Sequence, residues 1–161
     1  MKKSLGLSTP LIVLILASSL LQGQQLTVET DAGKRVLNRA DLESLPHLTV
    51  TASEHGSPAV SFEGVALKNV LEKAGVTFGE SMKGKRLRNC LLVEAADGYR
   101  VVIALPELDP AFTDRQTVLA FLRDGKPLSG KEGPYRIVIP DEKRMSRWVR
   151  QVTTLKIVDV Q

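Results

Sequence analysis

The chain has 161 residues, of which 43% are hydrophobic and 25% are charged, a composition that predicts one globular domain and excludes a disordered chain. The net charge of +4 falls to +2 when Lys2 and Lys3 are removed with a leader that contains no acidic residue. Such a mild basic excess excludes the footprint of a nucleic-acid-binding protein, so we expect no nucleic-acid partner.

An export signal peptide is predicted over residues 1–23, ahead of one domain that covers residues 24–161. Two lysines precede the apolar segment 11–21, and small or polar residues follow it. As a helix this segment would rise about 16 Å, well short of the roughly 30 Å hydrocarbon core of a bilayer. We therefore expect export by the general secretory route to the periplasm or the medium, with no membrane span after cleavage; an uncleaved anchor is the alternative.

Strands are predicted wherever β-branched and other apolar residues alternate, or run together, between turn-forming residues. The predicted strands cover residues 26–30, 35–37, 47–53, 90–95, 99–105, 117–122, 135–139 and 148–160, the last as one strand or two. Asp97-Gly98 lies between two of these runs and predicts a hairpin with a type I′ turn, because that turn needs positive φ angles. The basic stretch 83–88 is expected to be a solvated loop.

Two helices are predicted together with their ends. Asn38 and Asp41, three residues apart, are close to a capping box and predict a short helix over 39–45. A second helix has one apolar face, formed by Leu67, Val70, Leu71 and Ala74. Gly75 is placed to end this helix. With a further helical turn over 106–110, the pattern predicts an α+β domain, mostly β with a few short helices.

Six motifs in a fixed order resemble the sulfite-oxidase-type molybdopterin-binding domain family, over about residues 26–158. They are Phe62-Glu63-Gly64-Val65-Ala66-Leu67, Asp97-Gly98-Tyr99, Leu105-Pro106-Glu107-Leu108, Asp124-Gly125-Lys126-Pro127-Leu128, Gly133-Pro134-Tyr135-Arg136 up to Pro140, and Arg147-Trp148-Val149. The resemblance implies an α+β fold built from several small sheets. For active members it also implies a molybdenum centre held by a pterin dithiolene and one protein cysteine. Such members oxidise sulfite or reduce sulfoxides.

The sequence departs from this family at the metal ligand. The resemblance places the cysteine between the early strand and the helix that follows Gly64, where segment 50–56 has none. The single cysteine, Cys90, comes after the helix in an apolar run and is expected to be buried. Ser53 and His55 supply no thiolate. A leader with Lys-Lys would also export the chain unfolded and empty, so we expect no cofactor, with molybdopterin bound only if the family activity is retained.

Arg136 and Arg147 match the family positions near the pterin and are the candidates for an anion or pterin site, because a guanidinium suits phosphate and carboxylate groups. The alternative is ion pairing with the nearby acidic residues Glu132, Asp141 and Glu142. His55, in the loop over the cofactor mouth, is a third candidate. Trp148 is expected to pack in the core with its N–H bonded. Solvated surface charges are expected at Lys143, Arg144 and Arg150.

Three functions remain open at this point. The first is a non-catalytic exported domain that binds a small anionic ligand or a periplasmic partner protein in the former cofactor cleft. The second is a molybdopterin-dependent oxidoreductase with an unusual metal ligand, and the third is a purely structural domain. No catalytic residue and no metal ligand is assigned. The first hypothesis requires that Arg136 and Arg147 share one cleft.

Overall fold

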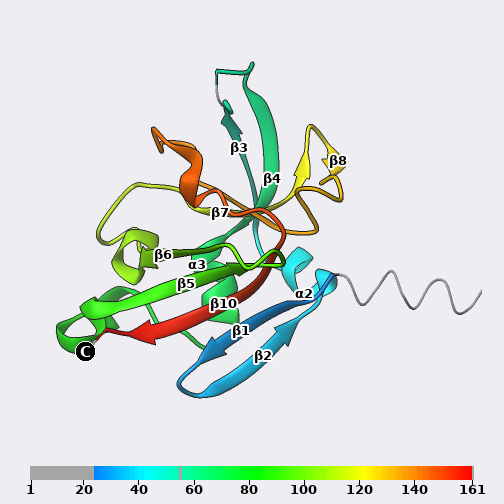
Figure 1. Cartoon of the computed structure of the whole chain (residues 1–161). Coiled ribbons are helices and arrows are strands. Elements are labelled where there is room, and N and C mark those ends of the chain that lie inside the picture. The colour runs from blue at the N-terminus through cyan, green and yellow to red at the C-terminus, as the bar shows by residue number, and fades with distance from the viewer. Residues whose placement is uncertain (1–23, 55, 161) are drawn as a thin grey trace, which may run out of the picture.

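The computed structural model describes residues 24–54 and 56–160, which form two sheets with short helices between and beside them (Figure 1). The strands are β1 (Leu26–Thr30), β2 (Gly33–Leu37), β3 (His47–Ala52), β4 (Val60–Ala66), β5 (Asn89–Ala95), β6 (Arg100–Ala104), β7 (Val118–Arg123), β8 (Lys126–Pro127), β9 (Arg136–Val138) and β10 (Val152–Asp159). The α-helices are α2 (Arg39–Glu43) and α3 (Leu67–Lys73). The 3₁₀ turns are η1 (Gly79–Ser81), η2 (Gly84–Arg88), η3 (Leu105–Leu108) and η4 (Met145–Arg147). This is the α+β architecture that the sequence predicts.

The first sheet has the order β2-β1-β10-β5-β6. The last strand, β10, lies in its centre, parallel to β1 and antiparallel to β5. The second sheet has the order β3-β4-β7-β8, and β9 also pairs with β7. The β3–β4 hairpin extends away from the rest of the molecule (Figure 1). The β3–β4 hairpin forms an arm of the second sheet, and its tip lies near the β5–β6 turn of the first sheet. Residues that are far apart in the chain therefore meet there.

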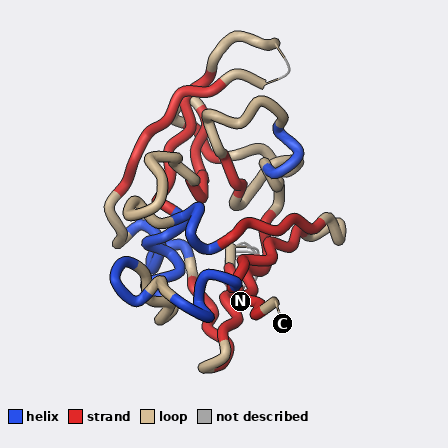
Figure 2. Tube along the Cα trace, turned by 90° about the vertical axis from the view of Figure 1, so that its left-hand side faces the viewer, coloured by secondary structure: helices blue, strands red, loops and turns tan. Residues whose placement is uncertain are grey.

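One hydrophobic cluster joins the two sheets and α3. It contains Leu91 and Leu155 from the first sheet, Phe62 and Leu119 from the second, and Leu71 from the helix, all of them buried. Most helical turns gather beside the strands in the view of Figure 2. Among the described residues, no helix is long and apolar enough to cross a membrane.

The predicted start of the first helix and the predicted end of the second are confirmed. At α2 the Asn38 side chain accepts a hydrogen bond from the Asp41 amide at 3.0 Å, and the Asp41 carboxylate accepts one from the Asn38 amide at 2.9 Å. This is a complete capping box. The helix is shorter than predicted and ends at Glu43, since Pro46 cannot continue it. After α3, Gly75 has a φ of +100°, as expected of a glycine that follows a helix.

The hairpin at Asp97-Gly98 is confirmed, but the predicted turn type is wrong. In this connection Gly98 alone has a positive φ, +85°, and its amide donates to the Ala95 carbonyl at 3.1 Å. The Ala95 amide donates to the Tyr99 carbonyl at 2.9 Å, so three residues connect the strands, as in a type I turn with a glycine bulge. Ala96 makes the connection one residue longer than the two-residue loop of a type I′ turn, and the turn type differs for this reason.

A two-residue turn with two positive φ angles occurs instead between β7 and β8. Asp124 has a φ of +48° and Gly125 a φ of +72°, as a type I′ turn requires.

The last strand, which was predicted from residue 148, starts later, at Val152. The cause is Gln151, whose φ of +49° interrupts extended backbone. Residues 148–151 instead run beside β9, and the Ile137 amide donates to the Val149 carbonyl.

Candidate functional site

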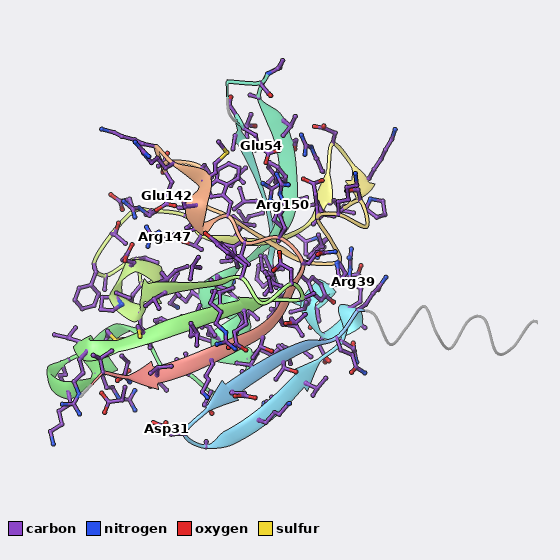
Figure 3. The ribbon with its side chains drawn as sticks, viewed as in Figure 1. Asp31, Arg39, Glu54, Glu142, Arg147 and Arg150 are labelled. Carbon is purple, nitrogen blue, oxygen red and sulfur yellow. The ribbon has the colours of Figure 1, made fainter. Side chains whose placement is uncertain are left out.

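A cavity of about 790 Å³ lies where three segments meet: the tip of the β3–β4 hairpin, the β5–β6 turn, and the segment before β10. Its charged lining residues are Glu54, Asp97, Arg136, Glu142, Lys143, Arg144 and Arg150. The uncharged ones are Ser53, Gly56, Ala95, Tyr99, Met145, Ser146, Trp148 and Val149. Figure 3 shows Glu54 on the hairpin arm, with Glu142 and Arg150 on the late segment beside it. The resemblance placed the cofactor cleft in this region, between the early strand and the Gly-Pro-x-Arg strand.

Arg136 forms the floor of the cavity and is buried, with 1% of its surface exposed. Its Nη1 donates to Glu132 Oε1 at 2.5 Å, and its Nη2 bonds Glu54 Oε1. Arg123 Nη1 lies 2.9 Å from both Glu54 Oε2 and Glu132 Oε1. Arg136, Arg123, Glu54 and Glu132 therefore form one network, in which carboxylates occupy both terminal nitrogens of Arg136 while its buried Nε has no partner among the described residues.

Two aromatic rings hold the Arg136 guanidinium in place. Its Cζ lies 5.3 Å from the Phe62 ring centroid and 5.5 Å from that of Trp148, within the range of cation–π attraction. The two rings meet edge to face at 6.1 Å. Trp148 Nε1 donates to the Ile139 carbonyl at 3.0 Å, which confirms the expected packed indole with a bonded N–H.

Glu54 is a buried acid whose pKa is set by opposing effects. Burial alone would raise the pKa of Glu54, but the hydrogen bond from Arg136 and the charges of Arg136, Arg123 and Arg150 together lower it below the usual 4.5. A pKa that is lower in the folded than in the unfolded state stabilises the fold above the unfolded value, and this stabilisation is lost as the pH falls through the folded value.

We therefore expect wild-type protein to lose more stability than the Glu54→Gln variant between about pH 6 and about pH 3. Urea unfolding midpoints across this range would measure the loss for each protein. Hydrogen bonds from the backbone amides of Ala111 and Gly79 also lower the pKa of Asp109. Asp109 is present in both proteins, so its contribution to the acid loss of stability is the same in each. Identical acid losses would show that the Glu54 carboxylate is not held by the arginines.

Arg147, the second predicted anion site, does not line the cavity. Its Nε donates to Glu142 Oε1 at 2.8 Å, and its Nη1 lies 3.2 Å from Glu107 Oε2. The hydrogen bond to Glu142 raises the pKa of Arg147. The structure thus brings Arg136 into the cavity and leaves Arg147 outside it, so the shared cleft that the sequence analysis requires for an anion site at these two arginines is not formed. Both arginines are ion-paired, Arg136 with Glu132 and Arg147 with Glu142, as the alternative in the sequence analysis describes.

The remaining sequence candidates have different outcomes. His55 lies outside the described residues, although Glu54 and Gly56 on either side of it line the cavity. Cys90 is buried on β5, as expected, and is not among the residues that line the cavity. Ser53 does line it and is exposed. In the described ranges, no group of three or more His, Cys, Asp or Glu side chains is arranged to hold a metal ion.

The mouth of the cavity carries cations that the sequence analysis assigned only to the solvated surface. Lys143 and Arg144 are exposed, and neither forms an ion pair with any residue that the structure describes. Arg150 Nη2 lies 3.7 Å from Glu54, with 52% of its side chain exposed. The signal that could have identified them was the clustering of these basic residues on either side of the family motif Arg147-Trp148-Val149.

Tyr99 closes one side of this mouth. It is 48% exposed, and its hydroxyl donates to the Ser146 carbonyl at 2.7 Å. This bond joins the β5–β6 turn to η4, in the segment that carries Lys143 and Arg144. The ring of Tyr99 is therefore exposed, while its hydroxyl is bonded to the protein.

Comparison with known proteins agrees with this architecture. The crystal structure of the sulfane dehydrogenase SoxCD from Paracoccus pantotrophus is similar with a TM-score of 0.64 and 21% sequence identity. The match covers 85% of this chain but only 38% of the solved chain, and at this identity it shows a shared fold. No curated protein matches. The family model "Oxidoreductase molybdopterin binding domain" matches residues 22–161, so this chain belongs to the oxidoreductase molybdopterin-binding domain family.

Proposed function

We propose that this chain is a non-catalytic, exported member of its family that binds an anionic ligand at the mouth of the cavity. The observation that carries the proposal is the set of exposed cations at the mouth, Lys143, Arg144 and Arg150, of which only Arg150 has a carboxylate within 4 Å among the described residues. Unneutralised cations that line a concave surface attract anions and raise their local concentration.

The residues that line the cavity do not fit a molybdenum centre with a cysteine ligand. Thiolate is the soft ligand that such a metal takes from the protein, and the only cysteine of the chain is buried elsewhere, on β5. The segment that follows β3, where the resemblance places the cysteine, carries Ser53 and Glu54. Glu54 is already bonded to Arg136 and paired with Arg123. This donor set supports a binding role over oxygen-atom transfer.

The floor of the cavity also favours anion binding at the mouth. Arg136 uses both terminal nitrogens on Glu132 and Glu54. A ligand at either terminal nitrogen of Arg136 would have to replace a bond that a glutamate already makes, whereas Lys143 and Arg144 form no ion pair within 4 Å with a described residue.

Cell fractionation followed by metal and pterin analysis tests the non-catalytic and exported parts of the proposal. We expect the protein in the exported fraction, folded, with molybdenum and pterin fluorescence far below one equivalent per chain. Stoichiometric molybdenum with pterin would overturn the proposal and favour an oxidoreductase with a new ligand set. Retention in the cytoplasm would contradict export, which rests on the Lys2-Lys3 leader and the short apolar segment.

Binding of poly-L-glutamate and of inorganic pyrophosphate, measured by calorimetry at low salt, tests the anion site. We expect at least one of these probes to bind, and the double variant Lys143→Ala/Arg144→Ala to weaken it by about tenfold. The matched control is Lys83→Ala/Lys85→Ala, which removes the same charge from exposed residues outside the cavity. Equal weakening by both double variants would show general charge attraction and would contradict a site at the mouth.

A further inference from the structure

We infer that the anionic ligand is an acidic, extended segment of a partner protein, not a free small anion. The inference rests on the proposed function, because it names the ligand class for the same cavity mouth. It is carried by the division of charge between floor and mouth, by the exposed tyrosine at the rim, and by the free sheet edge that leads out of the cavity.

The buried part of the cavity already holds carboxylates on both terminal nitrogens of its cation. The buried cation, Arg136, is neutralised by Glu54 and Glu132, so the cations available to a ligand are exposed ones. A single ion pair at an exposed cation contributes only about 0–1 kcal/mol, because solvent screens it. Several carboxylates on one segment can meet Lys143, Arg144 and Arg150 together, and linked contacts add without a new entropy cost for each.

The rim supplies the uncharged contacts that a protein segment requires. Tyr99 is 48% exposed, and its bond to Ser146 holds the ring beside Met145 and the two unpaired cations. Tyrosine, methionine and arginine are enriched where proteins bind other proteins. The cavity, at about 790 Å³, lies towards the upper end of the range of about 300–1,000 Å³ that encloses drug-sized ligands. It has room for several side chains.

A free sheet edge leads away from the mouth. β6 begins directly after Tyr99 and is the outer strand of its sheet (Figure 1). In the described part of the chain it pairs only with β5. Val102 on this strand is 54% exposed, on the same face as the exposed Arg100, so the edge offers both an apolar and a cationic contact. An extended segment that leaves the mouth can therefore add to β6 through main-chain hydrogen bonds, as in other cases of strand addition.

Selection from a phage-displayed library of random decapeptides tests this inference on the purified protein. We expect the selected peptides to be enriched in Asp and Glu, and to bind the double variant Lys143→Glu/Arg144→Glu about tenfold or more weakly. The control variant Lys83→Glu/Lys85→Glu has the same change in net charge and is expected to bind within about twofold of wild type, because it lies outside the cavity. Thermal unfolding verifies that both variants fold.

The other outcomes separate this inference from the proposed function. If no acidic peptide is enriched, or if the selected peptides bind all variants equally, while pyrophosphate or phosphate binds in a manner that depends on Lys143 and Arg144, the ligand is a small anion. The inference then fails and the proposed function stands. If neither peptides nor these anions respond to the mouth variants, both fail.

Discussion

The Arg136→Met variant is expected to lose about 3–5 kcal/mol of unfolding free energy, the range measured when one partner of a buried ion pair is removed. Arg136 is 1% exposed and is paired with Glu54 and Glu132, which keep their charges when it is gone. Methionine retains part of the packing against Phe62 and Trp148, so most of the loss comes from the two carboxylates, which lose their buried partner and keep Arg123 as the cation they share. Urea unfolding at neutral pH measures the change.

Arg147→Met is the matched control, since Arg147 is also paired with two glutamates. Its side chain is 26% exposed, so water can enter the space it leaves, and Arg115 remains 3.1 Å from Glu107 and 3.9 Å from Glu142. We expect a loss of about 1 kcal/mol or less, close to that of surface ion pairs. Adding Glu54→Gln and Glu132→Gln to Arg136→Met should recover part of the larger loss. Equal losses for the two single variants would contradict the burial difference that separates them.

The Gly64→Ala variant is expected to lose about 3 kcal/mol or more, at or above the usual range for overpacked cores. A Cβ at Gly64 would lie 2.1 Å from the Leu119 carbonyl oxygen and 2.7 Å from the Ala120 Cα. Both atoms are backbone in the adjacent strand β7, so neither can rotate away. The pairing of β4 with β7 shifts by one position between Glu63 and Gly64, which brings the strands into this close approach.

Gly130→Ala is the control for this prediction. A Cβ at Gly130 would meet no atom within 4 Å, and its φ lies outside the left-handed region. We expect its unfolding free energy to stay within about 0.5 kcal/mol of wild type. Urea unfolding and the yield of soluble protein would be measured for both variants. A Gly64→Ala protein with wild-type stability would show that β4 and β7 do not approach as closely as the structure places them.

Glu54 links the stability of the domain to its proposed function. It lies in the segment where the resemblance places the metal-binding cysteine, and its carboxylate pairs with the one buried arginine of the cavity floor. The network therefore balances its own charge inside the fold. Of the exposed cations at the mouth, Glu54 pairs with Arg150 and leaves Lys143 and Arg144 as the groups that an anion can reach.

Most of the local structure followed from the sequence alone, because it depends on neighbours in the chain. The capping box at Asn38 and Asp41, the apolar face of α3 with Gly75 behind it, and the Asp97-Gly98 hairpin all rest on contacts within a few residues. The type I′ turn predicted at Asp97-Gly98 was wrong, and such a turn occurs at Asp124-Gly125, because an Asp-Gly pair does not specify how many residues connect the two strands. The ordered motifs determined the family, which the comparison confirms.

Only the tertiary structure decided the chemistry of the cavity. The pair between Glu132 and Arg136 is four residues apart and could be anticipated, but Glu54 is 82 residues away from Arg136. Whether an arginine is free to bind a ligand depends on which carboxylates reach it and on how much water is excluded. Both properties arise when the hairpin arm packs against the late segment, and no local pattern encodes them. The sequence by itself thus determined the fold family and the missing thiolate, and the packing of distant segments decided which cations remain available at the mouth.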